Sequence, residues 1–236
     1  ISDAFGWRAA FAMLSVLAFA KALLLFIYLP QSVHKDQASF RSQFRILRNP
    51  LMQGHVLLSV LVFSGMFTAY TYLADMLERL AGFNGTVVGW CLMGFGAVGL
   101  LGNSLGGRMV DRHPLIASLT FCTFMIGGMV MVVPSMQSWP ALAFALAVWG
   151  VTQAALFLVS HVRLMKAAPQ APAFAASLNI AGGNLGIGLG AIVGGRVIDH
   201  LGLGSLGFAA AGIILLSILL ALLLMAAKPK VATCDA

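Results

Sequence analysis

The sequence predicts an all-α integral membrane protein with about seven transmembrane helices. Hydrophobic residues make up 60% of the 236 residues and charged residues only 9%, and the mean hydropathy is +0.96. A soluble domain of this size carries about 25% charged residues. The apolar residues form continuous runs of roughly 20 residues, the length that a helix needs to cross a bilayer. Because these runs lack the alternation of barrel strands, helices are the expected spanning form.

Breaker residues separate the expected spans, which begin near residues 9, 51, 86, 115, 140, 173 and 205. In chain order, the breaks fall at Pro30 and Pro50, Gly82 to Gly85, His113-Pro114, Pro134 to Pro140, Pro169 and Pro172, and Gly202 to Gly204. This spacing predicts a first helix over residues 1–30, a cytoplasmic linker over 31–50, a six-helix bundle over 51–228 and a cytoplasmic tail over 229–236.

The distribution of basic residues predicts the orientation of the spans. With seven spans, one side of the membrane would carry Arg8, Arg79 and Arg196, while Lys21 lies inside the first span. The other side would carry ten basic residues, namely Lys35, Arg41, Arg45, Arg48, Arg108, Arg112, Arg163, Lys166, Lys228 and Lys230. Cytoplasmic loops are rich in Lys and Arg. We therefore expect the N-terminus outside and the C-terminus in the cytoplasm, and we attribute the net charge of +7 to topology rather than to nucleic-acid binding.

The segment between about residues 30 and 50 has a helical pattern of its own. Its apolar and basic residues both recur at i, i+4 and i+7, as Phe40, Phe44 and Leu47 and as Arg41, Arg45 and Arg48. The pattern predicts a short amphipathic helix on the cytoplasmic leaflet, with its apolar face toward the lipid. A partner-binding segment is the alternative.

An internal repeat indicates the class of membrane protein. The string GGRMVDR at residues 106–112 closes the third span and recurs 88 residues later as GGRVIDH at residues 194–200, closing the sixth. Three spans separate the copies, so their directions are inverted, as in many secondary transporters. Glycines precede both copies in small-xxx-small rows (Gly102 and Gly106; Gly182, Gly186, Gly190 and Gly194). Such rows let helices approach closely, whether for sliding or for static packing.

Several further motifs are similar to those of a known family. They are GWR at residues 6–8, YTYLA at 70–74, GRMVDR at 107–112, ASLNIA at 176–181 and NLGI at 184–187. Together they resemble the major facilitator superfamily, and within it the bacterial drug and sugar efflux transporters related to arabinose-efflux permeases. The resemblance covers essentially the whole chain. It implies the C-terminal six-helix bundle of a twelve-helix fold, with two inverted three-helix repeats, plus the preceding helix.

The start of the chain bears on this resemblance. Residue 1 is Ile, and no basic signal sequence follows it. We therefore expect a truncated chain, in which residues 1–30 are the last helix of the N-terminal bundle. The missing N-terminal helical bundle of the same transporter is then an expected partner, together with the lipid bilayer.

Polar residues inside the spans are candidates for a substrate site, because a polar side chain in hydrocarbon is costly. The resemblance places the second, third, fifth and sixth spans along a central cavity. The candidates in those spans are Thr68, Tyr72, Asn103, Trp149, Gln153, Asn179 and Asn184. Thr68, either Thr71 or Tyr72, and Asp75 are expected on one helical face, and Trp149, Gln153 and Phe157 form an i, i+4, i+8 stripe. Alternatively, these amides only bond neighbouring helices.

A second group of candidates lies at the cytoplasmic ends of the spans. It consists of Gly107, Asp111 and Arg112 in the first repeat motif and Arg163 in the fifth span. By analogy with the loop motif of the family, we expect a gating role, with Asp111 paired to Arg163 in the outward-open state. A purely topological role for the arginines is the alternative. His161 could titrate near neutral pH, although an interfacial position would explain it equally well.

These expectations describe part of a secondary active transporter of the bacterial inner membrane. It would export a small sugar-like or drug-like molecule by alternating access, in antiport with protons, and both the direction and the coupling come from the resemblance. Alternatives are a seven-helix receptor or a membrane scaffold without transport. A retinal protein would need a lysine in its last span, where this sequence has none. No enzyme or cofactor is expected, since the histidines are scattered and catalytic motifs are lacking.

Overall fold

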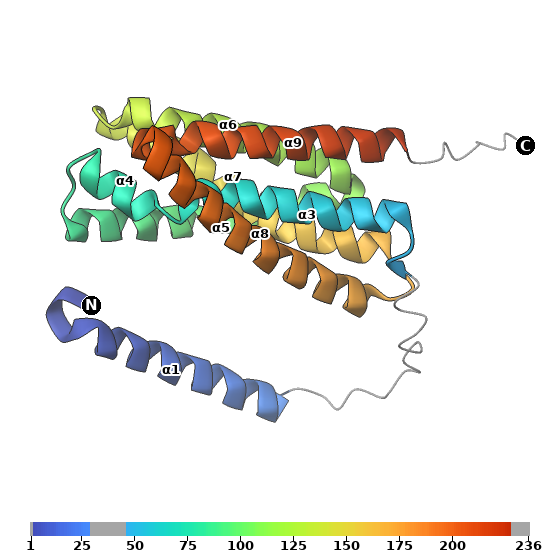
Figure 1. Cartoon of the computed structure of the whole chain (residues 1–236). Helices are drawn as coiled ribbons and strands as arrows, with labels where there is room; N and C mark the ends of the chain where they lie inside the picture. Colours follow the sequence, from blue (N-terminus) through green and yellow to red (C-terminus); the bar gives the residue numbers. More distant parts are fainter. Residues whose placement is uncertain (1, 29–45, 228–236) are drawn as a thin grey trace, which may run out of the picture. The chain divides into compact units, whose positions relative to one another are not determined.

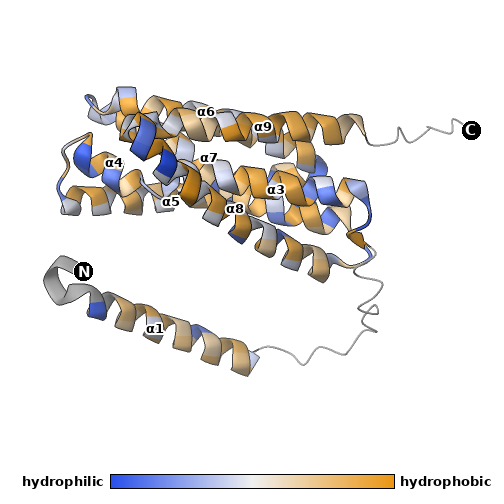
Figure 2. Cartoon of the chain, viewed as in Figure 1, coloured by the Kyte–Doolittle hydropathy of each residue, from blue (hydrophilic) through white to orange (hydrophobic). Residues whose placement is uncertain are grey.

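The structure is a computed structural model that describes residues 2–28 and 46–227 (Figure 1). Within these residues every regular element is a helix, and seven segments are long and apolar enough to cross a membrane. Hydrophobic residues dominate the length of helices such as α6 and α9 (Figure 2). The predicted fold class, an all-α membrane protein with about seven spans, is confirmed.

From α3 onward, apart from α4, the helices begin within one residue of the predicted starts, whereas α1 begins at Ser2, ahead of the start expected near residue 9. Their bounds are α1 Ser2–Tyr28, α3 Pro50–Tyr70, α4 Leu73–Arg79, α5 Gly85–Arg112, α6 Pro114–Ser135, α7 Trp139–Ala167, α8 Pro172–Leu201, the 3-10 turn η1 Leu203–Ser205, and α9 Leu206–Ala226. Proline stands in the first turn of four of them, α3, α6, α7 and α8, where its missing N–H costs no hydrogen bond. Asn84 caps α5 by accepting a 2.9 Å hydrogen bond from the Val87 N–H.

The chain divides into two units, residues 1–38 and 39–236. The first unit contains α1, a single apolar helix that includes Lys21. The second contains the bundle of α3 to α9. Residues 29–45 and 228–236 lie outside the described residues. The amphipathic helix predicted between residues 30 and 50 therefore falls almost entirely outside them, as does the tail at 229–236.

The second span is broken near its end. The Thr71 hydroxyl donates a 2.6 Å hydrogen bond to the Phe67 carbonyl, and the Tyr72 N–H donates to Ala69 O at 3.1 Å. This turn ends α3 at Tyr70, and α4 starts at Leu73. Thr68 therefore lies in α3 and Asp75 in α4, so the single helical face expected for these residues is interrupted at the turn.

The packing of the helices reproduces the inverted repeat. Helix α3 packs mainly on α8 and α9, and α7 packs mainly on α5 and α6. If α3, α5 and α6 form one repeat and α7, α8 and α9 the other, these two sets of contacts are equivalent. In each copy the glycine row of one repeat lies on the first helix of the other, with Gly106 against Ala155 and Gly186 against Val60. The predicted pair of three-helix repeats is confirmed.

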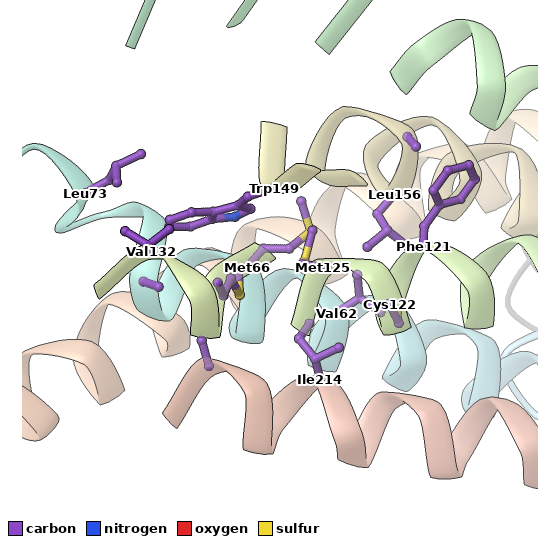
Figure 3. Close-up of a cluster of buried hydrophobic side chains, with 14 of the residues drawn as sticks. Val62, Met66, Leu73, Phe121, Cys122, Met125, Val132, Trp149, Leu156 and Ile214 are labelled. Carbon is purple, nitrogen blue, oxygen red and sulfur yellow. The ribbon is translucent and has the colours of Figure 1, made fainter. Parts of the chain in front are cut away.

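The core lies between α3, α6, α7 and α9. Met66, Met125, Trp149 and Ile214 are fully buried there, as Figure 3 shows. Lipid is as apolar as these side chains, so burial from water does not hold the spans together. Close van der Waals packing and bonds between helices must do so instead.

Candidate functional site

A cavity of about 580 Å³ opens between α3, α5, α7 and α8. Its polar lining consists of Asn103, Asn179, Asn184 and His161, and its other lining residues are Phe63, Phe157, Leu158, Ile180, Gly183 and Ile187. The volume lies within the range of roughly 300–1,000 Å³ typical of small-molecule sites. We call this the central cavity. It brings together three of the predicted substrate-binding residues, all of them asparagines, from two different helices.

Helix periodicity places the lining side chains on shared faces. On α8, Asn179, Gly183 and Ile187 follow at intervals of four residues, and on α7, Phe157 and His161 do the same. Phe157 meets Phe63 of α3 edge to face, with the ring centroids 4.7 Å apart and the planes at 88°. This aromatic pair closes the cavity wall between α3 and α7. Phe63 had not been predicted for the site, because one more Phe in an apolar span carries no distinguishing signal.

A hydrogen-bonded chain supports Asn179 from behind. The Ser59 hydroxyl of α3 donates to Asn179 Oδ1 at 2.9 Å, and Arg163 Nη2 of α7 donates to Ser59 Oγ at 2.8 Å. Arg163 Nη1 lies 3.1 Å from His55 Nδ1. All four side chains are buried. This series of hydrogen bonds fixes the direction of the Asn179 amide, because the amide oxygen already accepts from the serine.

Four other predicted ligands lie elsewhere in the bundle. Gln153 Oε1 accepts a 2.9 Å hydrogen bond from Trp149 Nε1, and both side chains are buried in the core. The buried Thr68 hydroxyl donates to Ser64 O within α3 at 2.8 Å. The Tyr72 hydroxyl donates to Ala191 O of α8 at 2.9 Å. None of the four is among the described residues that line the central cavity. Their role as substrate ligands stays a prediction.

The candidate gating residues are placed at the ends of α5 and α7. The expected Asp111–Arg163 pair is not formed, since Asp111 Oδ1 lies 3.2 Å from Lys166 Nζ. Lys166 also donates to the carbonyls of Val110 and Asp111, at 3.0 and 2.8 Å. It is the better partner because it lies one turn closer to the end of α7, level with the end of α5. Arg163 turns instead into the bundle, toward α3.

The remaining two gating candidates flank this contact. Arg112 is exposed in the last turn of α5. Gly107 faces α7, where a methyl group in its place would lie 3.6 Å from Leu158 Cδ2. A gating role for Gly107, Asp111, Arg112 and Arg163 stays a prediction.

Sequence reasoning missed His55 and Ser59, the partners of Arg163. Their signal is the i, i+4 spacing of two polar residues within an apolar run. That spacing alone does not reveal which helix their partner belongs to, since Arg163 is more than 100 residues away along the chain. In the part of the chain that the structure describes, no group of three or more His, Cys, Asp or Glu side chains lies close enough to hold a metal ion.

The chain is similar to a known family and to curated proteins. The sequence model of one protein family, the Major Facilitator Superfamily, matches residues 1–169 and 56–235. A "Probable sugar efflux transporter" of Helicobacter acinonychis (strain Sheeba) is 28% identical over 218 residues, which are 92% of this chain and 56% of that protein. Those of Pasteurella multocida (strain Pm70) and Helicobacter pylori (strain ATCC 700392 / 26695) are 28% and 29% identical, covering 89% and 92% of this chain and 52% and 56% of their own lengths. The chain thus spans about half the length of these relatives.

Proposed function

This chain belongs to the Major Facilitator Superfamily, and from that premise we propose that its bundle is the C-terminal half of a transporter that exports a small neutral sugar. The observation that carries the proposal is the central cavity, whose lining combines the asparagines Asn103, Asn179 and Asn184 with the aromatic residues Phe63 and Phe157. The names of the relatives add support, because each is described as a probable sugar efflux transporter.

The lining of the central cavity favours a neutral, hydroxyl-rich substrate. Amide side chains both donate and accept hydrogen bonds, as sugar hydroxyls do. Phe157 is 40% exposed, so its ring offers an apolar surface to the C–H face of a sugar ring. Among the described lining residues there is no Asp, Glu, Lys or Arg, so a drug-like ion would find no opposite charge. A neutral amphipathic drug-like molecule is the alternative substrate.

Transport by alternating access requires a second bundle across the cavity, and we propose the N-terminal helical bundle of the same transporter for this place. Asn103 and Asn184 are exposed on α5 and α8, and exposed amides at membrane depth are costly against lipid. Two bundles that rock around a midplane site would cover them in both states. The glycine rows would let α5 and α8 stay close to α7 and α3 during this motion.

Proton antiport would need a titratable group in the cavity, and we propose His161. Among the described lining residues it is the side chain that can gain or lose a proton. Proton binding at His161 would place a positive charge beside the substrate amides. Exchange requires that the sugar and the proton bind in turn rather than together, and a proton on a residue of the same lining would compete with the sugar in this way.

We propose that the protein lies in the bacterial inner membrane with the ends of α5 and α7 in the cytoplasm, because Arg108, Arg112, Arg163 and Lys166 gather there. Single cysteines at Asn84 and His113, introduced after replacement of the native cysteines, would test this orientation in intact cells. A membrane-impermeant maleimide should label the Asn84→Cys variant from outside and leave the His113→Cys variant unlabelled. The reverse pattern would refute the orientation.

Everted membrane vesicles provide the test of transport. One preparation would carry this chain alone and another would carry it with the N-terminal half of the Pasteurella multocida relative. We expect uptake of labelled arabinose, glucose or lactose that depends on the proton gradient in the second preparation, with glucuronate as the charged control. Absence of uptake for every neutral sugar in both preparations would reject sugar transport. Equal uptake by this chain alone would reject the need for a second bundle.

A further inference from the structure

We propose that a second cavity, separate from the central one, binds a phosphate-type oxyanion. This cavity has a volume of about 210 Å³ and lies where α3 and α6 begin and α7 ends. Its lining includes His55, Arg163 and Lys166, and it shares no lining residue with the central cavity. We call it the basic cavity. The inference does not depend on the proposed transport of sugars.

The burial of Arg163 is the first argument for an anion. Its side chain is 1% exposed, yet its hydrogen-bond partners are His55 and Ser59 rather than a carboxylate. Arg163 Nε has no hydrogen-bond partner among the described residues. A buried guanidinium without a counter-charge is strongly destabilising. Neither of these partners can supply a negative charge, since a serine hydroxyl is neutral and an imidazole is neutral or positive.

The charge of the basic cavity is the second argument. None of its described lining residues is an Asp or Glu. Lys166 of the lining is itself paired with the Asp111 carboxylate. This pair offsets the lysine and leaves the charge of Arg163 uncompensated. The cavity therefore favours a ligand that brings its own negative charge.

Two helix N-termini supply the third argument. Asn49 and Leu51 from the start of α3, and Pro114 and Leu115 from the start of α6, line the basic cavity. The first N–H groups of a helix lack intrahelical partners and attract anions. On α3, Asn49 already accepts from the Leu51 N–H at 3.0 Å. On α6, the N-cap residue His113 makes no side-chain capping bond, so the first turn of α6 is open to an anion.

The size and place of the cavity define the ligand. Its volume is below the roughly 300 Å³ at which sites for drug-sized molecules begin, so a single phosphate group fits better than a larger ligand. The arginine fork and helix N-termini are the donors that phosphate oxygens prefer. The phosphate could belong to a lipid headgroup at the membrane surface or to a free anion, and both sources share this chemistry.

Binding measurements on the full 236-residue chain would test the proposal and separate the two sources. Labelled inorganic phosphate would be titrated against the chain in a neutral detergent. Retention of phosphatidylglycerol, compared with phosphatidylcholine, would be followed by native mass spectrometry. We expect saturable binding of at least one probe. Retention of phosphatidylglycerol alone would assign a lipid headgroup, and binding of phosphate that displaces the lipid would assign a free anion.

Three variants make the test specific. Arg163→Gln should weaken binding about tenfold, since it removes a charge-assisted donor, and Lys166→Gln about threefold, since it removes a positive charge from the lining. Arg108→Gln removes the same charge from the exposed end of α5, outside the lining, and should bind as the unmodified chain does. If the Arg163→Gln protein does not fold, the affinity of Lys166→Gln for the probes still tests the proposal. The proposal is overturned if neither probe binds saturably, or if Lys166→Gln and a folded Arg163→Gln bind as tightly as Arg108→Gln.

Discussion

Ser59 of α3 donates a 2.9 Å hydrogen bond to the side-chain oxygen of Asn179 in α8. The same hydroxyl accepts a 2.8 Å hydrogen bond from Arg163 of α7. A hydroxyl can donate once and accept at the same time, so this one serine joins three helices. It also connects the wall of the central cavity to the buried guanidinium that lines the basic cavity.

Replacing Ser59 with Ala measures how much these hydrogen bonds contribute to the free energy of unfolding. The change leaves Arg163 Nη2 and Asn179 Oδ1 without this partner, so we expect the free energy of unfolding to fall by about 1–3 kcal/mol. Ser217→Ala is the matched control, because Ser217 is also fully buried but bonds Ile213 O within its own helix. Its effect should stay within about 0.5 kcal/mol. Unfolding in SDS, followed by circular dichroism, would measure both free energies of unfolding. Equal losses in the two variants would contradict a stabilising role of the Ser59 hydrogen bonds.

An amide of the central cavity and an amide of the core should behave differently in transport. Asn184→Leu removes an amide from the central cavity, so we expect KM for the sugar to rise about five- to tenfold. Gln153→Leu removes an amide that bonds Trp149 in the core, so it should lower stability by about 1–2 kcal/mol with little change in KM. Initial uptake rates in vesicles that contain both bundles would measure KM. If Gln153→Leu raised KM more than Asn184→Leu, the substrate would bind at the α7 stripe predicted from the sequence rather than in the central cavity.

The glycines of α8 differ in what lies beside them. A methyl group at Gly186 would lie 2.5 Å from the Val60 carbonyl oxygen of α3, whereas one at Gly188 would meet nothing within 4 Å. Gly186→Ala should therefore destabilise the bundle by about 1–3 kcal/mol through overpacking. Gly188→Ala should stabilise it by up to about 1 kcal/mol, because alanine favours the helix. The same SDS titration measures both variants. A neutral Gly186→Ala would show that α3 and α8 are not in close contact.

His161→Gln tests the proposed coupling to protons. The variant keeps a polar side chain in the central cavity but cannot change its charge, so we expect sugar exchange to persist while uptake driven by a pH gradient is lost. His200→Gln, at the exposed end of α8, is the control and should keep gradient-driven uptake. The measurement compares counterflow with gradient-driven uptake in the same vesicles. Full gradient-driven uptake by His161→Gln would assign the coupling to another residue.

Asp111→Asn separates a gating role from a stabilising one. The Asp111–Lys166 pair is largely exposed, so its loss should change the free energy of unfolding by less than about 1 kcal/mol. We nevertheless expect a shift in the accessibility of cysteines placed in the central cavity, because Lys166 ties the end of α5 to α7. Asp75→Asn breaks the exposed pair with Arg79 in α4 and is the control. Unchanged accessibility in Asp111→Asn would reject gating.

The predictability of the fold follows from the solvent. In hydrocarbon every backbone polar group must be bonded within the protein, which leaves only helices and closed barrels, so a continuous apolar run without alternation is expected to be a helix. The predicted starts near residues 51, 86, 115, 140 and 173 accordingly agree within one residue with α3, α5, α6, α7 and α8. The break at Thr71 and Tyr72 was not predicted, because it depends on side-chain and backbone bonds without a proline or glycine.

The candidate site was predicted in part. Asn103, Asn179 and Asn184 were expected together and line one cavity. The stripe of Trp149, Gln153 and Phe157 was expected on one face, but it divides between the core and the cavity. The reason is geometric. An α-helix has 3.6 residues per turn, so two steps of four residues rotate by about 80°, enough to turn Phe157 away from Trp149.

The sequence by itself determined the spans, their repeat and the family, because these depend on local hydropathy, on breakers and on motifs that can be read along the chain. Tertiary structure alone decided which polar groups meet. Arg163 could have paired with Asp111 by position, yet it bonds Ser59 and His55 while Lys166 holds the aspartate. Lipid gives apolar surfaces no preference between partners. The choice therefore depends on how closely the glycine rows let the helices approach, and on which donors and acceptors that approach brings within reach.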